Sequence, residues 1–218
     1  MPHIRRIGIL TAIAETELPA TLAAFDLPID SAPVRKEGSR YWLSKIRNVR
    51  GETIEIVISC TGKSGNTEVQ LPTERLIKLY QPECMIFVGI CCGIRAYSYG
   101  DVITSSLIWA YEYLKTTSKS PLDRSRAKVT PKHMCNDIEF FSSHTSWQNR
   151  YKSCLLKFPR ARFPRSAISP TLRKSYWFAS GEKVLAGGEL NSLNLKHDLI
   201  RAGEMEGYGF AAACDDRR

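Results

Sequence analysis

The sequence predicts a mixed α/β fold in which a mostly parallel central sheet is covered by helices on both faces. Short apolar runs, typical of buried strands, alternate along the chain with longer stretches of helical periodicity. The composition, 43% hydrophobic and 24% charged, is that of an ordinary globular protein. Because 218 residues fit one domain of this class, we expect a single domain over residues 1–218.

The first half of the chain shows this alternation most clearly. An apolar strand is expected first, followed by a helix whose Pro19 falls in the first turn, where proline is tolerated. A hairpin comes next, then a small-residue loop, a second helix and a buried strand. In order, these elements are expected at Ile4–Leu10, Glu15–Phe25, Tyr41–Val49 with Thr53–Cys60, Thr67–Tyr80 and Cys84–Ile90.

The second half repeats the pattern around one irregular segment. Strands and helices are expected at Asp101–Trp109, Ser175–Ser180, Glu189–His197, Leu199–Met205 and Gly207–Cys214. Between them lies a proline-interrupted insertion at about 115–175. Residues 113–175 hold 14 lysines and arginines against 3 acidic residues, so their net charge is +11 and the rest of the chain is at −2. The basic balance therefore belongs to one segment.

Several classes of protein are excluded by composition. The apolar runs are far shorter than the ~20 residues of a membrane-spanning helix, and no secretory signal is expected, because the N-terminal residues show no small-residue cleavage pattern. The seven cysteines form no Cys-x-x-Cys pair and share no ligand spacing with the four histidines. We therefore expect a cytoplasmic protein with reduced thiols, without a metal and without a membrane partner.

Three pieces of sequence, in this order, resemble the nucleoside phosphorylase/nucleosidase superfamily. They are an opening strand with a following acid (7–15), a glycine loop, central strand and small-residue turn (62–102), and the pair Ala179–Glu182 and Gly203–Gly207. The Glu-Met-Glu tripeptide at 204–206 is the most specific signal. The chain is closest to the branch typified by methylthioadenosine/S-adenosylhomocysteine nucleosidases and bacterial AMP- and ATP-cleaving nucleosidases.

The resemblance implies cleavage of the bond between a purine, adenine in this branch, and ribose. That reaction passes through an oxocarbenium-like sugar, as glycoside hydrolysis does. Glu206 would accept hydrogen bonds from the ribose 2′- and 3′-hydroxyls, and Met205 would pack against the sugar. Glu206 has a plainer alternative as a helix-start carboxylate stabilised by the helix dipole.

The resemblance also implies a water-activating base and a floor for the nucleoside. Glu15 is the expected base, and Glu17 is the alternative because the register after the first strand is open. By the same resemblance, Val184 and Leu185 would stack against the base, and Ile90, Cys91 and Cys92 would form the floor beneath the sugar and the base. For Val184, Leu185 and the two cysteines, simple core packing is the alternative. Cys92 stands where the family has glycine.

Water rather than phosphate is the expected nucleophile. The phosphorylase branch has an arginine before a Val-Gly-Ser turn, whereas this chain has Phe87-Val88-Gly89-Ile90. A phosphate site wants an arginine fork and hydroxyl donors, and both are missing here. The chemistry requires no cofactor.

The end of the chain raises two further hypotheses. In the family the general acid is an aspartate on a strand after the helix that begins near Glu206, so the fold is expected to be C-terminally incomplete at Arg218. A catalytically impaired remnant that only binds nucleosides is one alternative. A basic nucleic-acid-binding module, suggested by the arginines and aromatics of 158–165, is a weaker one. The resemblance implies a homodimer.

Overall fold

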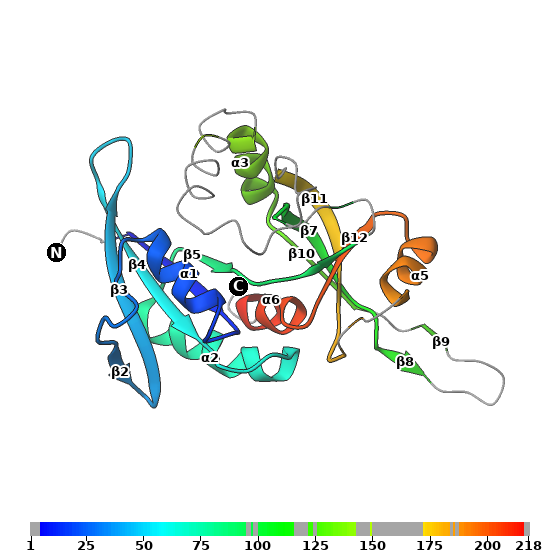
Figure 1. Cartoon of the computed structure of the whole chain (residues 1–218), viewed down its shortest axis with the longest axis horizontal. Helices are drawn as coiled ribbons and strands as arrows, with labels where there is room; N and C mark the ends of the chain where they lie inside the picture. Colours follow the sequence, from blue (N-terminus) through cyan, green and yellow to red (C-terminus); the bar gives the residue numbers. More distant parts are fainter. Residues whose placement is uncertain are drawn as a thin grey trace, which may run out of the picture. The chain divides into compact units, whose positions relative to one another are not determined.

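The computed structural model describes residues 5–94, 97, 100–115, 122–123, 126–142, 149, 172–183, 185 and 188–215. The chain divides into two compact units (Figure 1). The first unit comprises Met1–Ile90, Gly181–Lys183 and Met205–Arg218. The second comprises Cys91–Ser180 and Val184–Glu204.

The first unit is built on a five-stranded sheet in the order β2-β3-β4-β1-β5. The three strands β4, β1 and β5 are parallel to one another, whereas β3 pairs antiparallel with β4 and β2 antiparallel with β3. Their bounds are β1 Arg5–Thr11, β2 Val34–Lys36, β3 Ser39–Arg47, β4 Thr53–Cys60 and β5 Cys84–Phe87. The parallel strands therefore place their carboxyl ends at one edge of the sheet.

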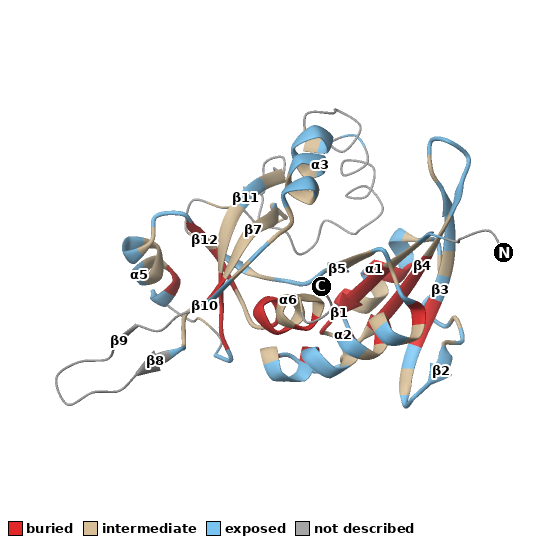
Figure 2. Ribbon diagram, turned by 180° about the vertical axis from the view of Figure 1, so that it is seen from behind, coloured by how far each residue is buried: buried red, intermediate tan, exposed pale blue. Residues whose placement is uncertain are grey.

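Helix α1 (Glu17–Ala24) covers one face of this sheet. Alternate residues of β1 and β4 point to it, because side chains of a strand alternate between faces. Leu22 of α1 packs against a buried cluster on this face, formed by Ile9, Trp42, Ile56 and Ile58. These strands are the most deeply buried part of the first unit (Figure 2).

Helix α2 (Asn66–Tyr80) covers the opposite face. Its Leu76 and Tyr80 pack with Tyr41 and Val57 of the sheet. A Cβ on Gly8 would lie 2.4 Å from Met85 Sδ and 2.7 Å from Leu76 Cδ2, so glycine at this position lets α2 approach β1 closely. Helix α6 (Gly207–Asp215) packs alongside α2 (Figure 1), and its Phe210 ring lies 5.6 Å from that of Phe87.

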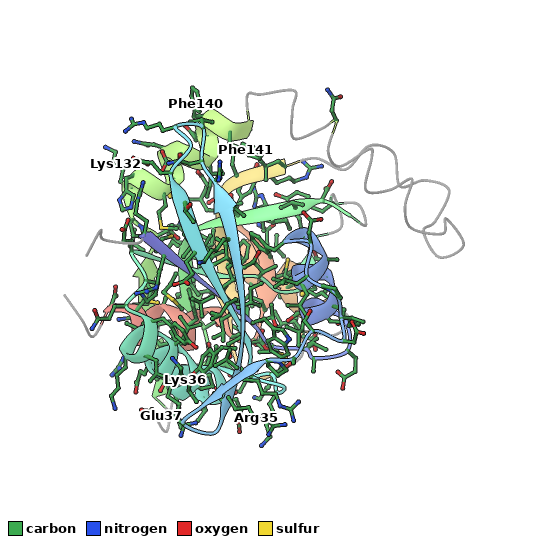
Figure 3. All side chains as sticks on the ribbon, turned by 90° about the vertical axis from the view of Figure 1, so that its left-hand side faces the viewer. Arg35, Lys36, Glu37, Lys132, Phe140 and Phe141 are labelled. Carbon is green, nitrogen blue, oxygen red and sulfur yellow. The ribbon has the colours of Figure 1, made fainter. Side chains whose placement is uncertain are left out.

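The outer edge of the sheet is short and charged. Glu37 and Gly38 both have positive φ, 47° and 76°, and form the tight turn between β2 and β3. Arg35, Lys36 and Glu37 lie at this end of the hairpin (Figure 3), and Lys36 Nζ lies 4.8 Å from the centre of the Tyr80 ring. A short edge strand with charged residues resists pairing with another chain.

The second unit has its own five-stranded sheet, in the order β10-β7-β11-β12-β6. The central pairings β7–β11 and β11–β12 are parallel, and both edge strands are antiparallel. The elements are β6 Cys92–Gly93, β7 Val102–Ala110, β8 Leu114–Lys115, β9 Leu122–Asp123, β10 Arg126–Val129, α3 Lys132–Ser142, β11 Leu172–Ser180, α5 Glu189–Lys196 and β12 Ile200–Glu204.

The core of the second unit lies beneath α5. Leu190 of α5 packs against Trp109, Ala179 and Ile200, one residue from each of three neighbouring strands. Helix α3 packs against β11 and presents Lys132, Phe140 and Phe141 (Figure 3).

The mixed α/β class predicted from the sequence is confirmed, but the described strands form two five-stranded sheets and a two-stranded sheet of β8 and β9 rather than one central sheet. The pairings β1–β4, β1–β5, β7–β11 and β11–β12 are parallel, and the other described pairings are antiparallel. The bounds of the predicted elements agree to within three residues; the largest differences are at β5, which ends at Phe87 instead of Ile90, and at β11, which begins at Leu172 instead of Ser175. Most of the basic insertion lies outside the described residues, and the single-domain assignment stays a prediction.

No helix in the described part of the chain is long and apolar enough to cross a membrane.

Candidate active site

Three loops meet at the carboxyl edge of the parallel strands of the first unit. They follow β1, β4 and β5 and comprise residues 12–16, 61–65 and 88–90. Backbone bonds join them to β1: Thr61 N donates to Thr11 O at 2.9 Å, and Val88 N donates to Leu10 O at 3.0 Å. In open α/β sheets, ligands bind at this edge.

Glu17 lies at this edge and is held by three main-chain donors. Its Oε2 accepts from Ala12 N at 2.8 Å and from Ile13 N at 2.9 Å, both in the loop after β1. Its Oε1 accepts from Ile90 N at 2.8 Å, in the loop after β5. The residue is 7% exposed, so a carboxylate is fixed in a buried position where two loops meet.

Glu15, which the sequence placed ahead of Glu17, is exposed in the structure. The chain turns after β1, and the turn is closed by Glu17 N and Leu18 N, which both donate to Ile13 O. Helix α1 therefore begins at Glu17 instead of at about Glu15. This shift directs the side chain of Glu17 back to the carboxyl edge and leaves that of Glu15 on the surface.

Glu206 is the second buried carboxylate of this edge, at 6% exposure. It directly precedes α6 and accepts the first helical bond of α6 through its carbonyl, from Phe210 N at 3.0 Å. Its side-chain Oε1 accepts from Gly65 N at 3.1 Å, and its Oε2 accepts from Met205 N at 3.3 Å. Residues 141 positions apart are thus joined at the start of α2.

Burial raises the pKa of Glu206 above its ordinary value of 4.5. The Gly65 and Met205 amides and the Ser64 side chain oppose this by hydrogen-bonding the charged form, and the negative charge of Glu17 reinforces it. Glu17 and Glu206 are therefore close enough for their charges to repel each other. Two buried carboxylates supported by main-chain donors form the centre of the candidate site.

A third carboxylate, Glu182, holds the first turn of α2. Its Oε1 accepts from Thr67 N at 3.1 Å and from the Thr67 hydroxyl at 3.2 Å. Gly65 has a φ of 122°, and a Cβ there would lie 2.7 Å from Glu182 Oε2, so this position requires glycine. Carboxylates are favourable at a helix N-terminus because unpaired N–H groups and the positive end of the helix dipole meet there.

The predicted substrate-binding residues are divided between the two units. Ile90 and Met205 belong to the first unit, and each donates its main-chain N–H to one of the two buried carboxylates. The side chain of Ile90 is 65% exposed. The structure thus brings Ile90, Met205 and Glu206 into one site with Glu17.

Cys91, Cys92 and Leu185 belong to the second unit. Cys92 Sγ donates to Gly203 O at 3.3 Å, and a Cβ on Gly203 would lie 2.6 Å from Leu185 and 2.9 Å from Cys92. Leu185 also packs against the core beneath α5. Burial raises the pKa of Cys91 to about 12. Val184 lies outside the described residues, so its role stays a prediction.

Sequence reasoning missed the residues that support the two carboxylates. From the sequence, Gly65 and Asn66 are recognisable only as part of a glycine loop, and Glu182 only as part of a motif. The signal for Gly65 was present in the pattern Ser-Gly-Asn directly before a helix, where a positive φ is common. The partners of that loop, more than a hundred residues away, leave no local signal.

A mixed α/β fold with acidic side chains at the carboxyl edge of parallel strands is the architecture of an enzyme or binding protein for small molecules. The comparisons identify the family. The sequence profile of the Phosphorylase superfamily matches residues 6–218, and the chain belongs to this superfamily.

Among curated proteins, the chain is similar to the ATP nucleosidase Cap17 of Escherichia coli (strain KTE188), with 25% identity over 226 residues. This alignment covers 98% of the chain but 43% of the relative, so the chain spans less than half the length of the curated protein that it matches.

Two solved structures from Helicobacter pylori share the fold. The futalosine hydrolase mutant of strain 26695 gives a TM-score of 0.65 at 17% identity, covering 98% of this chain and 84% of the other. A 5′-methylthioadenosine/S-adenosylhomocysteine nucleosidase in complex with a substituted pyrrolidin-3-ol gives a TM-score of 0.67 at 17% identity, covering 98% of this chain and 80% of the other. At 17% identity, these likenesses show a shared fold and nothing further.

Proposed function

We propose that the chain hydrolyses the N-glycosidic bond of an adenine nucleoside or nucleotide. The observation that supports this most is the pair of buried carboxylates, Glu17 and Glu206, held by main-chain donors at the carboxyl edge of parallel strands. The superfamily assignment and the similarity to an ATP nucleosidase support the same reaction class.

Glu206 is proposed to bind the ribose by accepting hydrogen bonds from its 2′- and 3′-hydroxyls. A carboxylate only accepts hydrogen bonds, so it suits two adjacent hydroxyls that both donate. Its two oxygens each accept one main-chain bond, from Gly65 N and Met205 N, which fixes the plane of the carboxylate before the sugar arrives. As the sugar gains positive charge in the transition state, a fixed negative group nearby stabilises it.

Glu17 is proposed to activate the water, in place of Glu15. A carboxylate has about four acceptor positions. The three N–H donors occupy two positions on Oε2 and one on Oε1, so Oε1 keeps one position for a water molecule. General base catalysis of this kind contributes about 10²–10⁴-fold.

The proposed reaction consumes one water and uses no cofactor. Water oxygen bonds to the anomeric carbon while its proton passes to Glu17, and the bond from that carbon to the purine nitrogen breaks. The purine leaves with the electron pair of that bond and takes up one proton from solvent, and Glu17 returns its proton to solvent. The products are adenine and ribose, or ribose with the 5′ substituent of the substrate.

The substrate is best tested with four adenine compounds: adenosine, methylthioadenosine, AMP and ATP. Free adenine is followed by chromatography in phosphate-free buffer. We expect adenine and a reducing sugar, and we expect added phosphate to leave the rate unchanged. A sugar 1-phosphate as product would show phosphorolysis instead.

The decisive variant is Glu206→Gln, which keeps the size of the side chain and removes its charge. We expect adenine release to fall by at least about 10²-fold. A matched control is Glu83→Gln, which removes a carboxylate paired at 2.8 Å with Arg5 at the amino end of β5. Equal activity of Glu206→Gln and the wild-type chain would exclude the proposed role, and no adenine from any of the four compounds would exclude the function. The predicted homodimer belongs to the same proposal and is measured by sedimentation.

A further inference from the structure

The first turns of helices α2 and α6 are joined by two reciprocal hydrogen bonds. The side-chain Oδ1 of Asn66, the first residue of α2, accepts from Gly209 N in the first turn of α6 at 2.7 Å. In return, Gly65 N, directly before α2, donates to the side chain of Glu206, directly before α6. Each bond satisfies an N–H or carboxylate group that the helix start leaves without a partner inside its own helix.

The two helix starts are too closely packed for α6 to move relative to α2. A Cβ on Gly209 would lie 2.0 Å from the carbonyl oxygen of Asn66 and 2.7 Å from its carbonyl carbon. The two backbones are therefore in direct contact, since glycine at 209 is what lets them approach. A shift of α6 along or around its axis would break the Asn66 bond or produce a clash.

The first turn of α6 determines the position of Glu206. Glu206 is the residue before α6, and its carbonyl accepts from Phe210 N at 3.0 Å. A rotation of this turn by a fraction of a helical step would move the carboxylate away from Gly65 N. The Asn66 bond fixes the same turn from its other side, at the third residue of the helix.

We propose that Asn66 is a positioning residue for sugar recognition, which holds the first turn of α6 so that the carboxylate of Glu206 meets the ribose hydroxyls. This inference rests on the proposed function, because it assigns to Glu206 the contact with the sugar. Asn66 itself touches no reacting atom. Its role is to make the ribose contact selective for a sugar with both hydroxyls.

The test is the discrimination between ribose and 2′-deoxyribose. If Glu206 accepts from the 2′-hydroxyl, the wild-type chain prefers adenosine over 2′-deoxyadenosine, and ATP over 2′-dATP, in both kcat/KM and equilibrium binding. Asn66→Ala frees the first turn of α6 and should reduce this preference about tenfold or more, because a hydrogen bond to a charged group is typically worth at least that factor. A loss of folded protein would lower both substrates equally and leave the ratio unchanged.

Asn66→Asp is the conservative variant, since it keeps an acceptor for Gly209 N. The acid limb is the fall of kcat/KM as the pH is lowered and Glu206 becomes protonated. At pH values well above this fall, the preference of Asn66→Asp for ribose should equal that of the wild-type chain. The added negative charge lies next to the amide that binds Glu206, so the acid limb should move to higher pH. This variant decides the matter if Asn66→Ala fails to fold: a lost preference or an unmoved acid limb would overturn the inference.

Asn48→Ala is the matched control. Asn48 Oδ1 also accepts main-chain bonds, from Arg50 N at 2.9 Å and Glu52 N at 3.0 Å, but in the turn before β4, at the opposite end of that strand from the Gly65 loop. It should leave the ribose preference unchanged. If Asn66→Ala keeps the full preference while the wild-type chain releases adenine, the positioning role is wrong and the proposed function stands. If the wild-type chain neither cleaves nor binds any of these compounds, both are wrong.

Discussion

The main-chain N–H of Ile90 donates to Oε1 of Glu17 at 2.8 Å and so joins the loop after β5 to the first turn of α1. The same carboxylate accepts two more N–H groups from the loop after β1. One side chain therefore organises the ends of two adjacent parallel strands. Since both oxygens are engaged, a water bound to Oε1 would have a defined position.

Glu17→Gln is expected to lower the rate of adenine release by about 10²–10⁴-fold, because an amide cannot take a proton from water at neutral pH. Its NH₂ group would also face N–H donors, so some loss of thermal stability should accompany the loss of rate. The comparison is Glu15→Gln, which changes an exposed carboxylate two residues away. Single-turnover rates of the two variants decide between them: a large loss in Glu15→Gln and none in Glu17→Gln would restore the assignment made from sequence.

The pH dependence of the proposed activity should reflect Glu206. Burial and the nearby charge of Glu17 raise the pKa of this carboxyl above 4.5. Only the ionised form accepts from both ribose hydroxyls, so kcat/KM should fall as the pH drops through the raised pKa. We expect the midpoint of the acid limb above 4.5 in wild-type chain, measured over a pH range in which circular dichroism shows the fold intact. A midpoint at or below 4.5 would contradict this assignment.

Glu206 should also lower stability at neutral pH. A carboxyl with a pKa raised by folding binds more protons in the folded state between its unfolded and folded pKa values, so stability falls as the pH rises through that window. Glu206→Gln removes this cost and is expected to raise the melting temperature near pH 7, with a gain that shrinks as the pH approaches 4.5. Melting curves at several pH values measure the effect, and a gain that does not depend on pH would point to a different cause.

Gly209→Ala is expected to destabilise the first unit by about 3 kcal/mol or more, since the added methyl group would lie 2.0 Å from the Asn66 carbonyl oxygen. Gly188→Ala is the control: Gly188 has a φ of −105° and no atom within 4 Å of an added Cβ. Its loss should stay below about 1 kcal/mol. Chemical unfolding of both variants gives the difference, and equal losses would show that α2 and α6 can separate at little cost.

The thiols of Cys91 and Cys214 should react slowly with alkylating reagents. Burial raises the pKa of both to about 12, and the thiolate is the reactive form. At pH 7.5, iodoacetamide is expected to label neither residue in the native protein and both after unfolding in guanidinium. Mass spectrometry of tryptic peptides provides the measurement. Rapid labelling of native Cys91 would show that its environment is more open than the structure indicates.

The sequence predicted the elements well because their periodicity is local. Strand β4 alternates Ile54, Ile56 and Ile58 with other residues, and in the structure these isoleucines do face α1. The run Cys84–Ile90 was expected to be one strand because it is apolar throughout. It ends as a strand at Phe87 because the following backbone turns to donate to Glu17, an interaction across 73 residues that composition does not encode.

The site was predicted only in part, because only some of its residues carry a local signal in the sequence. Glu206 was found through the Glu-Met-Glu tripeptide, which lies on consecutive residues. The choice between Glu15 and Glu17 depended on where α1 begins, and helix starts are among the least certain features of a sequence. The division of the strands into separate sheets depends on pairings such as β11 with β12, which local patterns do not reveal.

The bonds between the starts of α2 and α6 span 141 and 143 residues of chain. Contacts of such high sequence separation are slow to form, because a long loop must close before they bring any gain. The geometry around Glu206 should accordingly mature late, after the β1–β4–β5 strands have already assembled. Protection of the Gly209 amide from hydrogen exchange would then appear after that of the strand amides during refolding. The rate at which this one amide becomes protected would therefore report the rate at which the geometry around Glu206 forms.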